Sequence, residues 1–214
     1  MKSLIARDLK LLVRQGADSA AALVFFLIAG SLFAFAVGPS PAVLAHIAAG
    51  VVWVCALLAA LLPLDRVFGP DFEDGTLDLT LLSGLPAYEV ALAKAAVHWL
   101  TTGLPLLIIA PVLAVMLQLP SGEMGLLLAS LLPGSMIFSL LGTLAAAVTL
   151  GARRASVLMP VITLPLMIPA LIFGSSVAGS AHPAAAFYML GAIFATALPL
   201  APLGAGLALR AAAE

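Results

Sequence analysis

Long apolar stretches separated by short polar connections make up most of this chain. Crossing a bilayer takes roughly 20 apolar residues in a helix, and six stretches approach or exceed that length. They cover residues 18–37, 42–64, 96–118, 124–150, 157–178 and 184–209. Prolines in the later stretches are either ordinary for membrane helices or mark bent or broken, re-entrant segments, and we favour bends near the outer end of residues 157–178. We therefore expect an all-α integral membrane protein with six transmembrane helices and one domain over residues 1–214.

The composition excludes a soluble domain. Apolar residues make up 64% of the chain, charged residues 9%, and the mean hydropathy is +1.23, whereas about a quarter of a soluble domain is charged. The first apolar stretch, at about 18 residues, exceeds the 7–15 of a cleaved signal core, so we expect it to be retained as a span. The single cysteine, Cys55, allows no intrachain disulfide.

The basic residues predict the orientation of the chain. All nine fall on one side of the six-span arrangement, and cytoplasmic loops are the ones that collect lysine and arginine. We therefore expect both termini in the cytoplasm and the protein in a bacterial inner membrane. The nine are Lys2, Arg7, Lys10, Arg14, Arg66, Lys94, Arg153, Arg154 and Arg210.

Residues 1–16 predict a short amphipathic helix before the first span. Its cationic face carries Arg7, Lys10 and Arg14, opposite a broad apolar face that Asp8 interrupts. Such a helix lies in the membrane interface with its cations near anionic head groups. A basic leader that only sets the topology is the alternative.

No Asp, Glu, Lys or Arg lies deep within any of the six stretches. Ion-coupled transporters carry such groups within the membrane, so this pattern disfavours a transporter driven by its own gradient. The phosphate-binding pattern Gly-x-x-x-x-Gly-Lys-Ser/Thr is also missing. We expect no enzymatic activity in this chain, and any energy for transport has to come from another subunit.

The connection spanning residues 65–94 holds six carboxylates and two cations. Gly69-Pro70 is interpreted as a chain break, and Thr76 as the N-cap of a short helix that Ser83-Gly84 ends. Leu77, Leu81 and Leu82 are expected to form an apolar stripe along this helix. An apolar stripe flanked by acids can dock in the groove of a partner protein. A solvated surface loop is the weaker alternative.

Candidate site residues follow from these patterns. Two histidines on the external side, His46 and His182, could bind haem iron axially, although interfacial or packing roles are favoured for them. We expect no metal site. The residues predicted to couple the chain to a partner are Asp65, Arg66, Asp71, Phe72, Glu73, Asp74, Gly75, Thr76, Leu77 and Asp78.

Several motifs together resemble one known family. They include Arg7-Asp8-Leu9, Phe35-Ala36-Val37-Gly38-Pro39, Leu64-Asp65-Arg66, Phe72-Glu73-Asp74-Gly75-Thr76-Leu77-Asp78, the run from His98 to Leu106, and Pro169-x-Leu171-Ile172-Phe173-Gly174. The chain is similar to ABC-2-type (type V exporter-like) permeases. More narrowly, it resembles the CcmB family, the permease subunits of the system I ABC complex for cytochrome c maturation.

The resemblance implies a role in haem export or in release of a haem-loaded chaperone. ATP would be hydrolysed by a separate CcmA-like subunit, and haem would be a substrate rather than a resident cofactor. CcmC- and CcmD-like membrane subunits, a periplasmic CcmE-like chaperone and a second copy of this chain are the expected partners; nucleic acid is not. A non-transporting scaffold, a purely mechanical subunit of the same assembly, and a generic ABC-2 exporter of another substrate stay open.

Overall fold

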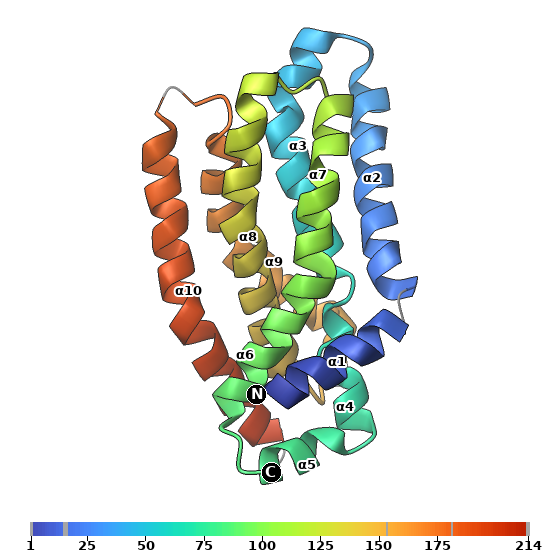
Figure 1. The fold of residues 1–214 in the computed structure, drawn as a ribbon, viewed down its shortest axis with the longest axis vertical. Coiled ribbons are helices and arrows are strands. Elements are labelled where there is room, and N and C mark those ends of the chain that lie inside the picture. Colours follow the sequence, from blue (N-terminus) through green and yellow to red (C-terminus); the bar gives the residue numbers. More distant parts are fainter. Residues whose placement is uncertain (1, 15–16, 153, 181, 213–214) are drawn as a thin grey trace.

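The computed structural model describes residues 2–14, 17–152, 154–180 and 182–212. These residues form helices and turns, with no strand among them (Figure 1). Six helical segments are long and apolar enough to cross a membrane, which confirms the prediction of an all-α, multi-pass membrane protein. The helices of the bundle are α2 (Ala17–Val37), α3 (Pro41–Leu61), α6 (Ala87–His98), α7 (Leu104–Met116), α8 (Ser121–Val148), α9 (Ala155–Ser176) and α10 (Pro183–Ala212).

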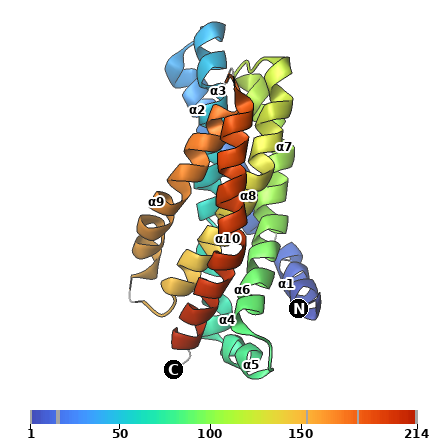
Figure 2. The ribbon, with the colours of Figure 1, turned by 90° about the vertical axis from the view of Figure 1, so that its left-hand side faces the viewer.

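Helix α8 occupies the middle of the bundle. It packs against α3, α6, α7, α9 and α10, whereas α2 lies at one side against α3 and α7. Both chain termini lie at the same end of the bundle (Figures 1 and 2), which we call the terminal end. The shorter helices α1 (Lys2–Arg14), η1 (Leu64–Arg66), α4 (Gly69–Glu73) and α5 (Thr76–Leu82) gather there.

A tryptophan fills the centre of the core. Trp53 of α3 is fully buried and meets Phe138 of α8 edge to face, with ring centroids 5.7 Å apart. Its indole also lies against Gly134 of α8 and Gly174 of α9, where an added Cβ would come within 2.1 Å and 2.0 Å of ring atoms. Only glycine fits at these two positions, so α8 and α9 both pack closely against Trp53.

The third span is a composite of α6, a π-helical turn η2 (Trp99–Gly103) and α7. Pro105 has no N–H to donate to the carbonyl of Thr101 one turn earlier, and the helix widens into a π-turn just before it. Helix α6 begins directly after Pro86. The helix of the third span therefore starts about two and a half turns before the apolar stretch at 96–118.

The prolines of the last two spans do not break their helices. Helix α9 is continuous through Pro160, Pro165 and Pro169, and α10 is continuous through Pro199 and Pro202. The re-entrant alternative for these segments is therefore wrong. Their neighbours in the bundle stabilise helices that would otherwise be weakened by missing N–H donors.

Candidate functional site

Three short helices, η1, α4 and α5, make up the acidic connection between α3 and α6, and we call residues 64–82 the acidic segment. Gly69 and Pro70 begin α4 instead of breaking the chain. Proline is tolerated in the first turn of a helix because the N–H that it lacks would have no partner there. The interpretation of this dipeptide as a simple break is therefore wrong.

The start of α5 depends on Asp74 and Gly75. Gly75 adopts a left-handed φ of 76°, and the Thr76 N–H donates to Asp74 Oδ1 at 2.9 Å. Thr76 is thus the first helical residue, and its prediction as the N-cap is wrong. Hydrogen bonds from the side chain and the backbone of Thr76 lower the pKa of Asp74. The predicted end of the helix at Ser83 and Gly84 is confirmed, with Gly84 at a φ of 84°.

Apolar side chains fix the acidic segment to the bundle. Leu64, Phe68 and Leu77 are buried in one cluster with Ala145 of α8 and Leu209 of α10. Leu64 also fills the space that a Cβ on Gly142 of α8 would need. A displacement of the acidic segment would therefore act directly on α8 and α10, which it contacts.

The opposite side of the segment is open. Glu73, Asp74 and Asp78 are exposed, and beside them lie Leu79 and Leu82, which are 70% and 82% exposed. We call these five residues the outer face. The predicted stripe of Leu77, Leu81 and Leu82 is therefore wrong in part, because Leu77 points into the core while Leu82 joins Leu79 outside. Asp65, Arg66 and Phe72 are also exposed, and Gly75 is half-buried.

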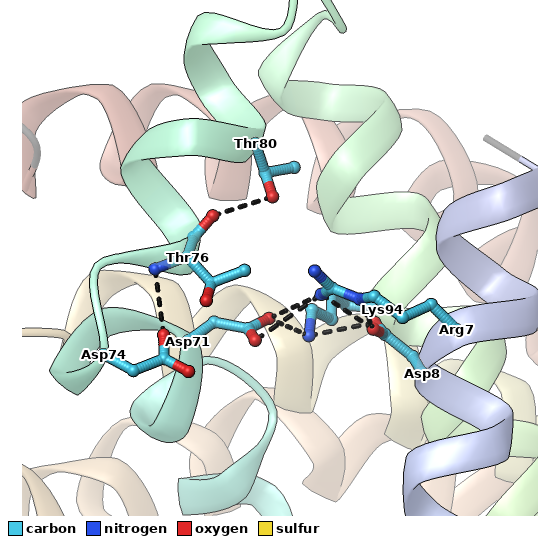
Figure 3. A network of polar contacts seen from close by, with 7 residues as sticks. All are labelled: Arg7, Asp8, Asp71, Asp74, Thr76, Thr80 and Lys94. Atoms are coloured by element: carbon cyan, nitrogen blue, oxygen red, sulfur yellow. Dashed lines mark hydrogen bonds and ion pairs between the residues drawn. The ribbon is translucent and has the colours of Figure 1, made fainter.

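Four charged side chains from three helices meet at the terminal end, and we call Arg7, Asp8, Asp71 and Lys94 the charge cluster (Figure 3). Lys94 of α6 forms ion pairs with both carboxylates, at 2.9 Å from Nζ to Asp8 Oδ2 and with an even closer contact to Asp71 Oδ2. Arg7 Nη2 lies 2.9 Å from Asp8 Oδ1 and 3.3 Å from Asp71 Oδ2. Two cations thus neutralise two anions.

The charge cluster changes the interpretation of two residues. Asp71 was grouped with the residues expected to meet a partner, but it points toward Lys94 and Arg7 and its side chain is 16% exposed. Asp8 interrupts the apolar face of α1 because it is an ion-pair partner, with 5% of its side chain exposed. Sequence reasoning missed this role, although a lone acid on an apolar helix face is itself a signal of a buried counter-ion.

The other residues of α1 that were expected to lie at the membrane interface have different environments in the structure. Burial alone would lower the pKa of Arg7, but the hydrogen bond to Asp8 and the nearby carboxylates raise it. Lys10 is exposed, and the side chain of Arg14 lies outside the described residues. Leu4 of the apolar face packs against Val90 and Ala93 of α6, so part of that face contacts protein.

The two histidines for which haem binding is the weaker alternative lie on the surface. His46 and His182 are exposed, and the His182 N–H donates to Ser180 Oγ at 3.1 Å. Within residues 2–14, 17–152, 154–180 and 182–212, no hydrogen bond or ion pair joins them. No group of three or more metal-binding side chains occurs in those ranges either.

A pair of polar contacts inside the bundle was not predicted. His98 Nδ1 lies 2.9 Å from Ser139 Oγ, and Trp99 Nε1 donates to Ser135 Oγ at 3.0 Å. The two serines are one helical turn apart on α8, so together they fix the start of the π-turn against the central helix. Nothing in the sequence identifies the partners of these serines on another helix.

The chain matches one protein family and several named relatives over nearly its whole length. The family described as "CcmB protein" matches residues 1–212. The chain is 47% identical to "Heme exporter protein B" of Paracoccus denitrificans and 44% identical to that of Rhodobacter capsulatus, over 98% of each chain. It is 40% identical to the Escherichia coli protein of the same name, over 95% of this chain and 94% of that one. The chain therefore belongs to the CcmB protein family.

Proposed function

We propose that this protein is the membrane subunit of a haem exporter for cytochrome c maturation, driven by a separate ATPase that docks on the acidic segment. Membership of the CcmB family and relatives named "Heme exporter protein B" at 40–47% identity support the haem-export role. The six long apolar helices fit a permease subunit, which is a transporter component and not itself an enzyme.

The distribution of basic residues supports an orientation with the terminal end in the cytoplasm. Eight of the nine lysines and arginines fall in the termini or in the connections on that side of the six spans. The ninth, Lys94, lies in α6 near the same end, where it pairs with Asp8 and Asp71. With this orientation the acidic segment faces the cytoplasm of a bacterial inner membrane, where an ATPase has access to its substrate. The resemblance of its motifs supports assigning the chain to the ABC-2 class of permeases, and the cationic face of α1 supports placing that helix at the membrane interface.

The observation that carries the docking proposal is the composition of the outer face. Two leucines that are 70% and 82% exposed lie among three exposed carboxylates. Scattered single apolar residues are normal on a surface, but a short helix that presents both chemistries suits an apolar groove with a basic rim. An ATPase subunit of the CcmA type would supply that groove and bind the ATP.

The partners and the route of haem rest on the family. CcmC- and CcmD-like subunits, a CcmE-like chaperone and a second copy of this chain complete the proposed assembly, and haem is a substrate rather than a cofactor. His46 is exposed in the second turn of α3, and His182 is exposed in the connection between α9 and α10. Their exposure fits brief contact with haem better than permanent ligation, and release of haem by a mechanical action of this subunit fits equally well.

Charge reversal of the outer face tests the docking. Asp78→Arg together with Leu82→Asp is introduced into the full chain, which is purified with its partner subunits from membranes. We expect the ATPase subunit to be lost from the complex and haem export to fall with it, because a basic rim would repel the arginine and the apolar groove would reject the aspartate. Glu123→Gln in the first turn of α8 is the control. Unchanged association and export in the double variant would contradict the proposal.

A further inference from the structure

The charge cluster joins the acidic segment to two other helices in a way that apolar packing does not. Helix α1 is already attached to α6 by Leu4, Val90 and Ala93. Helix α4, in contrast, contributes no buried residue of its own. Its link to α1 and α6 is Asp71, which contacts both Arg7 and Lys94 (Figure 3).

Stability alone does not explain why charges make this link. Replacing a largely buried ion pair by apolar residues of similar volume is often neutral or stabilising, whereas removing one partner is costly. Lys94 has 11% of its side chain exposed and lies between carboxylates from two different helices. An apolar side chain at position 94 would bury a comparable area, but it would form no specific link to either of the two helices that carry these carboxylates.

Charges, however, keep two elements together while they move. Dispersion contacts lose about a quarter to a half of their attraction when a gap of 0.5–1 Å opens, but the attraction between charges falls only with the first power of distance. A cation between two carboxylates can therefore follow α4 without losing its hold on α1. The open outer face and Asp71 of the charge cluster belong to one continuous segment, Gly69–Leu82, so a force on the outer face reaches Asp71.

We propose that Lys94, Asp71 and Asp8 act as positioning residues that transmit the displacement of the acidic segment to α6 and α1. This inference rests on the docking of an ATPase on the outer face. Motion of α4 pulls Lys94 through Asp71, and Lys94 lies on the helix that continues through the π-turn into the third span. Asp8 makes α1 follow the same displacement.

A double-variant experiment separates this role from simple stabilisation. Lys94→Met leaves the cluster with one unpaired negative charge, and Asp71→Asn leaves it with one unpaired positive charge. Combining them restores neutrality but not the ionic link between α4 and α6. We expect each single variant to lower both the melting temperature and haem export, and the double variant to recover the melting temperature alone.

The readouts are haem export per unit of assembled exporter in vesicles, the melting temperature, and the affinity for the ATPase subunit. In the double variant we expect export to stay about tenfold below wild type, in the middle of the range of coupling energies between contacting residues, with ATPase affinity within about twofold. Lys94→Arg, which keeps a cation between the carboxylates, should retain export. Glu89→Gln removes a charge from α6 at a residue with no ion pair in the described part of the chain, and serves as the control.

Two outcomes overturn the inference. Export that recovers together with the melting temperature in the double variant would reduce the cluster to a stabilising contact. If export in the double variant fell only in proportion to a loss of ATPase binding, the charge cluster would affect docking of the ATPase and not the transmission of its motion. Failure of the docking proposal looks different, because the outer-face variant would then keep both ATPase binding and export.

Discussion

In the middle of the bundle, Trp53 lies between Gly134 and Gly174 and meets Phe138 edge to face. At the terminal end, α1, α4 and α6 meet through Arg7, Asp8, Asp71 and Lys94. The first contact depends on shape and the second on charge. Close packing holds only over a fraction of an ångström, whereas ion pairs tolerate larger displacements. The bundle is therefore firm where three spans cross and more adjustable where a partner is proposed to act.

The largest effect is expected from filling the space beside Trp53. Gly174→Leu would place its Cβ about 2.0 Å from two indole atoms, and neither ring nor backbone can yield that far. Overpacking typically costs about 1–3 kcal/mol and occasionally more. Because this clash is severe, we expect the unfolding free energy to fall by more than about 3 kcal/mol, or no folded protein to form at all. The yield of monodisperse protein and chemical denaturation in detergent measure this.

Two further variants test whether shape is the cause. Gly191→Ala on α10 has no atom within 4 Å of the added Cβ and should behave like wild type. Trp53→Leu in the Gly174→Leu background should recover part of the yield. A Gly174→Leu protein as stable as wild type would show that shape does not hold the interior.

Removing one charge from the charge cluster should cost less, but still clearly. Asp8→Asn leaves Lys94 with one carboxylate in a site where Asp8 is 5% exposed. We expect a loss of about 3 kcal/mol, typical of breaking a buried ion pair from one side. Asp78→Asn, an exposed acid on the outer face, should stay within about 0.5 kcal/mol of wild type. Equal effects of the two substitutions would remove the distinction between cluster and outer face.

A smaller loss is expected where polar contacts supplement the packing of the interior. Ser139→Ala removes the partner of His98 Nδ1 inside the bundle. Leaving a buried polar group without its hydrogen bond costs about 1–3 kcal/mol, so chemical denaturation should show a decrease at the lower end of that range. Ser176→Ala on α9, whose exposed hydroxyl bonds its own helix, is the matched control. No difference between the two serines would mean that His98 is held by packing alone.

The smallest effect concerns the start of α5 and depends on pH. Hydrogen bonds from Thr76 lower the pKa of Asp74 in the folded protein. Their contribution is therefore present above the ordinary carboxyl pKa and is lost as the pH falls through the lowered value. Asp74→Asn should speed hydrogen exchange of residues 76–82 at neutral pH, and the difference from wild type should shrink in acid. A difference that grew in acid would contradict this assignment.

Much of the fold could be predicted because it depends on local patterns. Apolar length gives the six spans, Pro86 marks the start of α6, and Ser83-Gly84 marks the end of α5. The family resemblance, based on motifs along the whole chain, was confirmed by the match over residues 1–212. Each of these signals is complete within a few residues or is repeated along the sequence.

The errors and omissions share the opposite cause. In the charge cluster, Asp8 and Lys94 form an ion pair although they lie 86 positions apart in the sequence. No periodicity reveals which acid meets which base. The N-cap at Thr76 was wrong because Asp74 and Gly75 offered a competing turn. Leu82 was misplaced because a seven-residue helix is too short for its inward side to be read from spacing alone. The predicted coupling and haem contacts of the site remain predictions.

The position of Lys94 has a consequence for how the protein is made. Asp8 and Asp71 both precede it in the sequence and are its ion-pair partners. Synthesis runs from the N-terminus, so both counter-ions have left the ribosome before this ammonium group does. The third span can therefore enter the bilayer with its cation already neutralised. A nascent chain that lacks α1 would have to insert the same helix without Asp8, one of the two counter-ions.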